Sequence, residues 1–175
     1  MLIFASLCTG TYSCIASTAG PAANTQQKKP NNRPRIIDKI LVEKSKRTMT
    51  LYRKGIATKT YKIALGGVPI GHKQEEGDKK TPEGVYQISF KNPVGIAGKT
   101  LLISYPNGED TQRARAARKN PGGNICIHGL WPNLRHLGAN HVKYDWTLGC
   151  IAVTDAEMEE IYAVTEIGTV IEIIP

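Results

Sequence analysis

A cysteine and a histidine in the last third of the chain have the types and settings that nucleophilic catalysis needs. His128 ends the apolar run Ile125–Ile127, and Cys150 follows a glycine in the segment Asp145–Ile151. The thiolate is the reactive form of cysteine, and a neighbouring imidazolium favours it by lowering the pKa of the thiol. The pair therefore predicts an acyl-transfer site with Cys150 as the nucleophile and His128 as the general base.

Glycines beside both residues add features that the same chemistry uses. Gly129 lets the backbone turn after the histidine, and Gly149 allows close approach of backbone amides. The amides of Gly149 and Cys150 are therefore predicted to form an oxyanion hole. The segment Thr154–Glu157 has the form of a capping box, which predicts a helix just after Cys150 whose positive end lowers the pKa of the thiol.

Three other interpretations of the cysteines stay open from sequence. A cysteine is commonly a small buried residue without reactivity. Zinc is a second interpretation, because four ligating side chains are available, namely Cys126, His128, His141 and Cys150. Against it, a Cys-x-His spacing is not a usual chelating unit, and zinc would occupy the nucleophile. Cys126 and Cys150 could also pair as a disulfide that inactivates the thiol. The acyl-transfer interpretation requires no metal and no organic cofactor.

Short strands separated by loops must position these residues. Alternating apolar residues and turn signals predict strands over 36–42, 48–52, 57–65, 85–90, 101–105, 124–127 and 169–174. Helical spacing after the capping box predicts a helix from Thr154 to Thr165, and Thr111–Lys119 is predicted as a short basic helix. Many strands with one or two short helices predict a mostly-β fold, either a sandwich or a half-open barrel.

The first 35 residues differ in composition from the rest. Residues 1–27 have no charged side chain, and an apolar stretch followed by small residues resembles the later part of a secretory signal. Residues 28–35 form a basic polar linker, and 36–175 form the predicted domain. We therefore expect export to the periplasm or cell envelope. The usual basic start of a signal is missing and Cys14 lacks the full lipoprotein pattern, which leaves the start of the protein and its lipidation open.

The net charge of +8 comes from one part of the chain. Residues 28–54 carry ten Lys and Arg against two acidic residues, whereas the chain from Gly55 onward has thirteen of each sign. A nucleic-acid-binding domain spreads basic residues along a binding face, so no nucleic-acid partner is expected. A weak association with anionic surfaces and a solvated linker remain the two interpretations of the basic segment. No apolar run approaches the roughly 18–20 residues of a membrane-spanning helix.

The sequence around the two candidate catalytic residues resembles the L,D-transpeptidase (YkuD-type) catalytic domain of bacterial cell-wall enzymes. That family has a His-Gly pair, a variable loop, and a Ser/Thr-x-Gly-Cys segment followed by a hydrophobic residue. His128–Gly129 and Thr147–Ile151 match this pattern, the second as an Asp-Trp-Thr-x-Gly-Cys variant. Gly66–Gly71 and Lys80–Tyr86 resemble the family's glycine turn and Thr-Pro-x-Gly segment, so the resemblance covers Ile36–Pro175.

This resemblance implies a YkuD-like β-sandwich and a reaction on peptidoglycan stem peptides. Cys150 would attack the carbonyl between an L-centre and a D-centre, and His128 would act first as base and then as acid. The backbone carbonyl of Gly129 would orient the imidazole. The acyl-enzyme would pass to an amine acceptor, on a peptide or an anchored protein, or to water. A carboxypeptidase or endopeptidase of the same fold and a non-catalytic peptidoglycan-binding module are the alternatives.

The chain departs from the family pattern close to the cysteine. The family often has a histidine where this chain has Leu148, and Arg and Asn just past the cysteine, where Ala152 and Thr154 or Asp155 stand here. The variant suggests hydrolysis or a specialised acceptor, and those substrate contacts are not carried over.

Four residues near the site are candidates for substrate binding, namely Trp131, Arg135, Trp146 and Thr147. His72 and the run Glu75–Lys80 are interpreted as a solvated loop. Arg113, Arg115 and Arg118 are interpreted as the wet face of the basic helix.

Overall fold

The structure, a computed structural model, describes residues 35–175. The predicted signal-like segment, residues 1–27, and all but the last residue of the basic linker lie outside the described residues. Within 35–175, no helix has both the length and the apolar character to cross a membrane.

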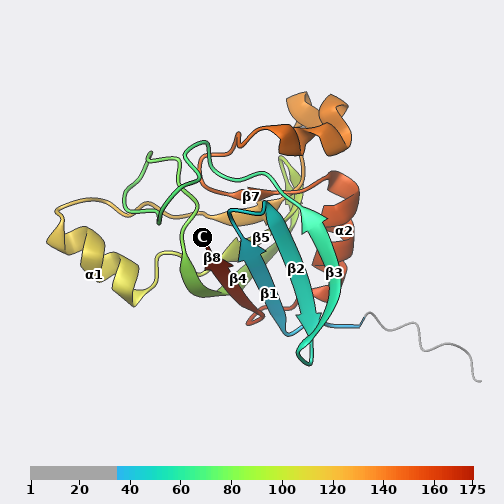
Figure 1. The fold of residues 1–175 in the computed structure, drawn as a ribbon, viewed down its shortest axis with the longest axis horizontal. Coiled ribbons are helices and arrows are strands. Elements are labelled where there is room, and N and C mark those ends of the chain that lie inside the picture. Colours follow the sequence, from blue (N-terminus) through green and yellow to red (C-terminus); the bar gives the residue numbers. More distant parts are fainter. Residues whose placement is uncertain (1–34) are drawn as a thin grey trace, which may run out of the picture. The chain divides into compact units, whose positions relative to one another are not determined.

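Eight strands form one mixed sheet in the order β3-β2-β1-β8-β4-β5-β6-β7. Their bounds are β1 Lys39–Glu43, β2 Thr48–Arg53, β3 Ile56–Lys62, β4 Gly84–Gly95, β5 Gly98–Ile103, β6 Cys126–His128, β7 Ile151–Ala152 and β8 Val170–Ile174. Neighbouring strands are antiparallel except for the pairs β1–β8 and β6–β7. The last strand thus inserts between β1 and β4 (Figure 1).

The sheet curls at β4, which belongs to both of its halves. Residues Gly84–Gln87 pair with β8, whereas Ile88–Gly95 pair with β5 through a ladder with two register shifts. Bulges of this kind bend a strand and increase its twist. Buried Ile, Leu, Val, Met and Tyr side chains from both halves form one hydrophobic cluster. This arrangement confirms the prediction of a mostly-β, sandwich-like fold.

Within residues 35–175, three short helical segments accompany the sheet. α1 spans Gly108–Ala116 and α2 spans Asp155–Val164, and each begins with a complete capping box, at Asn107 and Thr154 respectively. The third, η1, spans Pro132–Lys143 in 3-10 geometry and is broken at Gly138. The sequence predicted one or two helices and left η1 as a loop, because proline, glycine and asparagine interrupt any apolar periodicity there.

Each of the seven predicted strands overlaps an observed one, and three of them, 48–52, 124–127 and 169–174, agree within two residues at both ends. β4 continues five residues beyond the predicted end at Phe90, since its ladder with β5 crosses Pro93 at an irregular position. β3 ends at Lys62, three residues before the predicted end, and Ala64 instead forms an isolated bridge to Ala152. β7 has only two residues, too few for a periodic signal.

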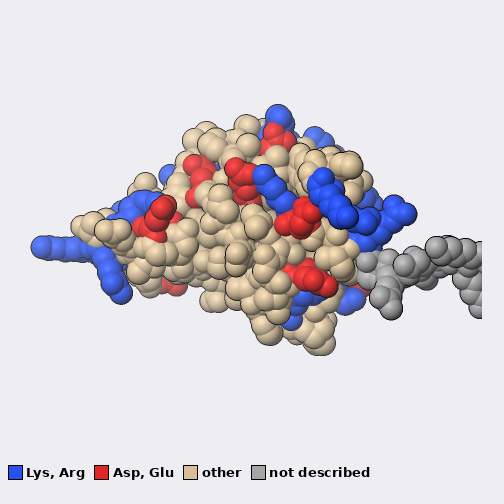
Figure 2. Space-filling view, turned by 90° about the horizontal axis from the view of Figure 1, so that it is seen from below, with Lys and Arg blue, Asp and Glu red and all other residues tan. Residues whose placement is uncertain are grey.

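Ion pairs neutralise much of the positive charge in residues 35–54, the described part of the basic segment. Lys39 pairs with Glu172, Lys46 with Glu43, and the buried Lys44 pairs with Glu83 at 2.7 Å. On the face that Figure 2 shows, acidic and basic side chains are interspersed. Such a surface is not the continuous basic footprint of a nucleic-acid-binding face.

Candidate active site

The ends of two neighbouring parallel strands bring Cys150 and His128 together. β6 and β7 pair Ile127 with Ile151 and His128 with Ala152, and Cys150 directly precedes β7. Because side chains alternate along a strand, His128 and Cys150 lie on one face of this pair. Cys126, two residues before His128, shares the same face.

A backbone hydrogen bond fixes the orientation of the His128 ring. Its Nδ1 lies 2.6 Å from the carbonyl oxygen of Gly129 and donates to it, so Nε2 is the nitrogen available to the thiol. The ring is only 6 % exposed, and the edge of Trp146 packs against it with 5.8 Å between ring centroids. Glycine fits at position 129, since a Cβ there would lie 2.5 Å from the Asp155 carboxylate and 3.0 Å from the Ala97 carbonyl oxygen.

The electrostatics of the site favour a thiolate on Cys150. A hydrogen bond from the Cys126 thiol is the largest cause that lowers the pKa of Cys150; burial opposes it, and the interaction with His128 and the Cys126 N–H, 3.4 Å from Sγ, add to the lowering. Burial by itself lowers the pKa of His128, but the contact with Cys150, its charge and the Gly129 carbonyl raise that pKa overall. Both shifts favour a thiolate–imidazolium pair.

The prediction that a helix N-terminus activates the thiol is wrong. Cys150 precedes β7, and α2 begins only after its cap at Thr154. The influence of a helix dipole falls off within its first turn. The two short-range partners, Cys126 and His128, therefore replace the helix as the cause of the lowered pKa.

Thr147 shapes the turn that presents the cysteine. Its hydroxyl accepts the Gly149 N–H at 3.1 Å and donates to the Cys150 carbonyl at 2.8 Å. Gly149 has φ +131°, and a Cβ at this position would lie 2.7 Å from the Lys80 carbonyl oxygen, so glycine is required. Of the two amides predicted for the oxyanion hole, the Gly149 N–H is thus used within the turn. The Cys150 N–H is the one that this hydrogen bond leaves for a substrate oxygen.

Asp145 anchors the same segment from the other side, a role that sequence reasoning missed. Its carboxylate accepts hydrogen bonds from the Arg47 guanidinium at 2.8 to 3.1 Å and from the Leu65 N–H at 3.0 Å. The Thr147 N–H donates to the Leu65 carbonyl, and the Gly67 N–H donates to the Thr147 carbonyl. The first hairpin and the glycine turn therefore hold the cysteine segment in place.

A cavity of about 920 Å³ opens at the two residues. Cys150 and His128 line it, together with three of the four predicted substrate contacts, Trp131, Trp146 and Thr147. Sequence reasoning missed the other wall residues, which include Lys73, Glu76, Asn120, Asn124, Asn133, Leu134 and Leu148. One feature of the sequence could have indicated these wall residues, namely the Asn-Pro-Gly-Gly-Asn run at 120–124, just before β6. A loop rich in glycine exposes its backbone amides and carbonyls, which can then line a site. Leu148, 73 % exposed, gives the rim an apolar side chain where the family often has histidine.

Arg135 does not line this cavity, contrary to the prediction. Its Nε lies 3.0 Å from Asp155 Oδ2, and Oδ1 of the same carboxylate accepts the Leu130 N–H at 2.7 Å. Both partners are about half exposed, so the ion pair contributes little stability. Arg135 instead connects η1 to the first turn of α2.

The zinc interpretation has no cluster to support it. Within the part of the chain that the structure describes, no group of three or more His, Cys, Asp or Glu side chains could hold a metal ion. His141, the fourth proposed ligand, is fully buried against Trp146, with 6.4 Å between ring centroids. Burial lowers the pKa of His141 and thus favours the neutral ring.

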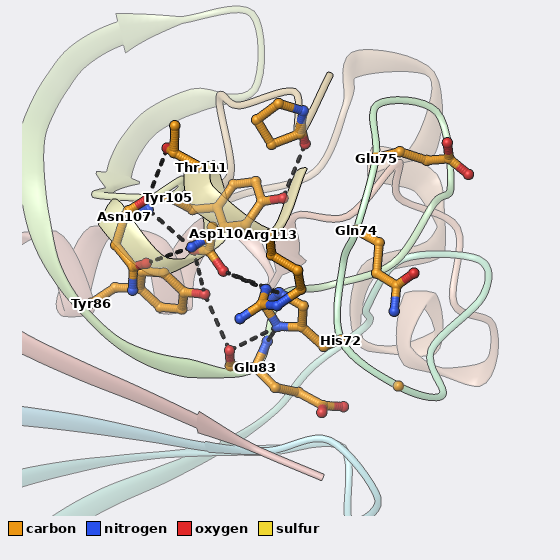
Figure 3. Close-up of polar contacts among 12 residues, drawn as sticks. His72, Gln74, Glu75, Glu83, Tyr86, Tyr105, Asn107, Asp110, Thr111 and Arg113 are labelled. Atoms are coloured by element: carbon orange, nitrogen blue, oxygen red, sulfur yellow. Dashed lines mark hydrogen bonds and ion pairs between the residues drawn. The ribbon is translucent and has the colours of Figure 1, made fainter. Parts of the chain in front are cut away.

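Figure 3 shows a buried polar cluster around Asp110, next to the loop that contains Gln74 and Glu75. Lys73, Glu76 and Gly77 of that loop line the cavity. Asp110, 3 % exposed, accepts hydrogen bonds from the Tyr86 hydroxyl and Arg113, each at 3.0 Å, and lies 3.1 Å from Nε2 of His72. The Glu83 N–H donates to Nδ1 of His72 at 3.0 Å. The interpretation of His72 as part of a solvated loop is therefore wrong. Arg113 is exposed, as predicted, although its guanidinium also contacts Asp110.

The loop after His72 extends from this cluster to the cavity. Lys73 is buried and pairs with Asp78 at 2.8 Å. Beyond it, the Glu76 N–H donates to the Asn120 carbonyl, and the Asn120 side chain donates to the Glu76 carboxylate at 2.7 Å. The cluster thus positions a wall of the cavity from outside it.

Replacing Asp110 by alanine is expected to lower the free energy of unfolding by about 3 kcal/mol, because it leaves buried donors without their charged acceptor. Chemical denaturation followed by circular dichroism measures this change. Glu109→Ala, which removes an exposed carboxylate one residue earlier, is the matched control and should stay within about 0.5 kcal/mol of the wild type. Equal effects of the two substitutions would show that the cluster does not stabilise the fold.

Comparisons with known proteins agree with this architecture. The family model described as the L,D-transpeptidase catalytic domain (YkuD) matches residues 37–173. YafK of Escherichia coli strain K12 is 29% identical over 129 residues, which are 70% of this chain and 45% of YafK. The helical cell shape determining protein Pgp2 from Campylobacter jejuni superimposes with a TM-score of 0.60 at 27% identity, over 78% of this chain and 47% of Pgp2.

A more distant structure shares the fold alone. The L,D-transpeptidase from Mycobacterium smegmatis has a TM-score of 0.52 at 12% identity, over 78% of this chain and 58% of that one. This chain thus spans about half the length of the first two relatives.

Proposed function

We propose that this chain, which belongs to the YkuD family of L,D-transpeptidase catalytic domains, transfers acyl groups of peptidoglycan stem peptides through a thioester on Cys150. One observation carries the proposal: a thiol with a lowered pKa and an oriented imidazole with a raised pKa share one open cavity. A thiol that ionises readily and an imidazole that can hold a proton are the two groups that a cysteine acyltransferase requires.

The first half-reaction forms the acyl-enzyme. The Cys150 thiolate attacks the carbonyl carbon between an L-centre and a D-centre, and the carbonyl electrons move to its oxygen. The Cys150 N–H would donate to that oxygen. As the tetrahedral intermediate collapses, the C–N bond breaks and His128 gives its Nε2 proton to the leaving amine. The products are a thioester and a free amine.

The second half-reaction reverses these roles. Neutral His128 takes a proton from the incoming amine while its nitrogen attacks the thioester carbonyl. The C–S bond then breaks and Cys150 returns to the thiolate. Water in place of the amine gives hydrolysis, so a carboxypeptidase or endopeptidase differs only in the acceptor.

The cavity supports an extended peptide rather than a small molecule. Trp131, which is partly exposed, and Trp146 supply aromatic surface on one wall, and exposed Leu148 extends the apolar rim. Carbonyl and amide groups from the loop Asn120–Asn124 supply polar contacts on another. We assign Trp131 and Trp146 to substrate binding and Thr147 to the turn, and we withdraw Arg135 from the site.

A cell-envelope location follows from this substrate. Pgp2, one of the relatives of known structure, is described as a helical cell shape determining protein, which fits an enzyme of the wall. Peptidoglycan lies outside the cytoplasmic membrane, so a protein that modifies it has to be exported. The signal-like composition of residues 1–27 is consistent with that route.

Incubation with purified muropeptides, followed by mass spectrometry, tests the proposal. Cross-linked dimers, with loss of the terminal D-residue from the donor, are expected for a transpeptidase. Trimmed monomers or released anchored peptides would instead show that the same site hydrolyses the acyl-enzyme. Unchanged muropeptides that nevertheless bind the protein would contradict catalysis and favour a binding module.

A further inference from the structure

We propose that Cys126 is a resolving cysteine, and that peroxide converts Cys126 and Cys150 into a reversible disulfide that closes the site. The pairing rests on the geometry of two thiols. Only its effect on activity rests on the proposed function.

The fold places the two cysteines side by side on neighbouring strands. Cys126 and Cys150 each precede the first of two paired residues, Ile127 and Ile151, on neighbouring parallel strands. The Cys126 N–H points at the Cys150 sulfur at 3.4 Å, and both sulfurs contact the Asn124 carbonyl oxygen, at 3.4 and 3.7 Å. Both thiols are free in this structure. Residues in adjacent positions of neighbouring strands lie within the Cα separation that a disulfide spans.

The two thiols also differ in their tendency to ionise, and formation of a disulfide through a sulfenic acid needs this difference. Cys150 lines the cavity, is partly exposed and favours the thiolate, which is the form that peroxides oxidise. Cys126 keeps its proton, because its hydrogen bond to Cys150, burial and the negative charge of Cys150 raise its pKa. Once Cys150 is oxidised to a neutral sulfenic acid, that negative charge is gone and Cys126 ionises more readily.

The oxidation proceeds in two balanced steps. First, the Cys150 thiolate attacks one oxygen of hydrogen peroxide, the O–O bond breaks, and hydroxide leaves and takes up a proton to form water. The sulfur of Cys150 is oxidised to a sulfenic acid by two electrons, and the peroxide is reduced. Second, Cys126 loses its proton and attacks the Cys150 sulfur, the S–O bond breaks, and the leaving hydroxide becomes water.

This disulfide would protect the nucleophile as well as inactivate it. A sulfenic acid without a partner is oxidised further to sulfinic and sulfonic acids, which reducing thiols do not restore. A disulfide with Cys126 stops the oxidation at a state that a dithiol reverses. The nucleophile is then blocked under oxidising conditions and becomes available again on reduction.

Peptide mass mapping of the full chain after hydrogen peroxide treatment tests the inference. We expect the peptides of Cys126 and Cys150 to be linked, with loss of two hydrogen atoms, and dithiothreitol to restore alkylation of both. In Cys126→Ser, dimedone should trap a sulfenic acid on Cys150, and longer exposure should yield sulfinic and sulfonic acids. The double variant Cys8→Ser/Cys14→Ser should form the same disulfide as the wild type.

Two results would overturn the inference. One is a Cys150 that pairs with Cys8, Cys14 or another molecule; the other is irreversible oxidation of Cys150 as fast in the wild type as in Cys126→Ser. None of these readouts requires a substrate. A protein that forms the disulfide but leaves muropeptides unchanged would therefore contradict the proposed function and keep this inference, and the converse result would do the opposite.

Discussion

Replacing Cys150 by alanine is expected to reduce muropeptide processing at least about 10³-fold, because it removes the sulfur that forms the acyl-enzyme. Two measurements follow the loss: the rate of product formation by mass spectrometry, and the mass of the intact protein after incubation with a carbapenem. The wild type should carry one adduct on Cys150 and the variant none.

Cys126→Ala is the comparison for this variant. It removes a thiol that donates to the Cys150 sulfur but leaves the nucleophile, so processing should continue at a reduced rate. Processing by Cys150→Ala at the wild-type rate would contradict the mechanism. A carbapenem adduct on Cys126 in the wild type would move the nucleophile to the neighbouring residue.

Substituting His128 by glutamine is expected to slow processing by about 10² to 10⁴, the usual contribution of a general acid and base. The pH dependence gives a sharper readout. In the wild type, iodoacetamide should alkylate Cys150 well below the ordinary thiol pKa of about 8.5, because the thiolate persists as the pH falls. In His128→Gln the pKa of Cys150 should rise, so alkylation at neutral pH should slow.

At high pH, the rate of processing depends on the protonated form of His128 rather than on the thiolate. Processing should fall as the pH rises through the raised pKa of His128, because the leaving amine needs a proton from the imidazolium. His136→Gln is the matched control, since His136 is an exposed histidine of η1 that does not line the cavity. An unchanged alkylation profile in His128→Gln would show that the imidazole does not activate the thiol.

Sequence reasoning performed best where function depends on backbone conformation. A glycine beside the histidine indicated a backbone turn and another beside the cysteine indicated a close approach of backbone, and Gly129 and Gly149 indeed stand where a Cβ would collide with a neighbouring segment. The capping box at Thr154 and the final strand were equally visible, because each depends on a few adjacent residues. The mostly-β fold and the family followed from these local patterns.

The parts that sequence reasoning missed depend on contacts between distant segments. Asp145 contacts Arg47, and His72 contacts Asp110. The residues of each pair are far apart in the sequence, and the hydrophobic periodicity of a segment carries no information about such contacts. Arg135 was placed in the site because its charge suits a carboxylate substrate, whereas Asp155 from α2 already binds it. The cause of the lowered pKa of Cys150 was misassigned for the same reason, since a two-residue strand separates it from the helix.

The position of β8 has a consequence for how the molecule is made. Val170–Ile174 lies between β1 and β4, so its backbone completes the ladders of two strands formed much earlier in synthesis. Until those residues leave the ribosome, β1 and β4 each present an unpaired edge, and pairing over so many residues is slow. Because β8 lies inside the sheet, loss of Val170–Ile174 would divide the sheet in its middle rather than shorten it at an edge.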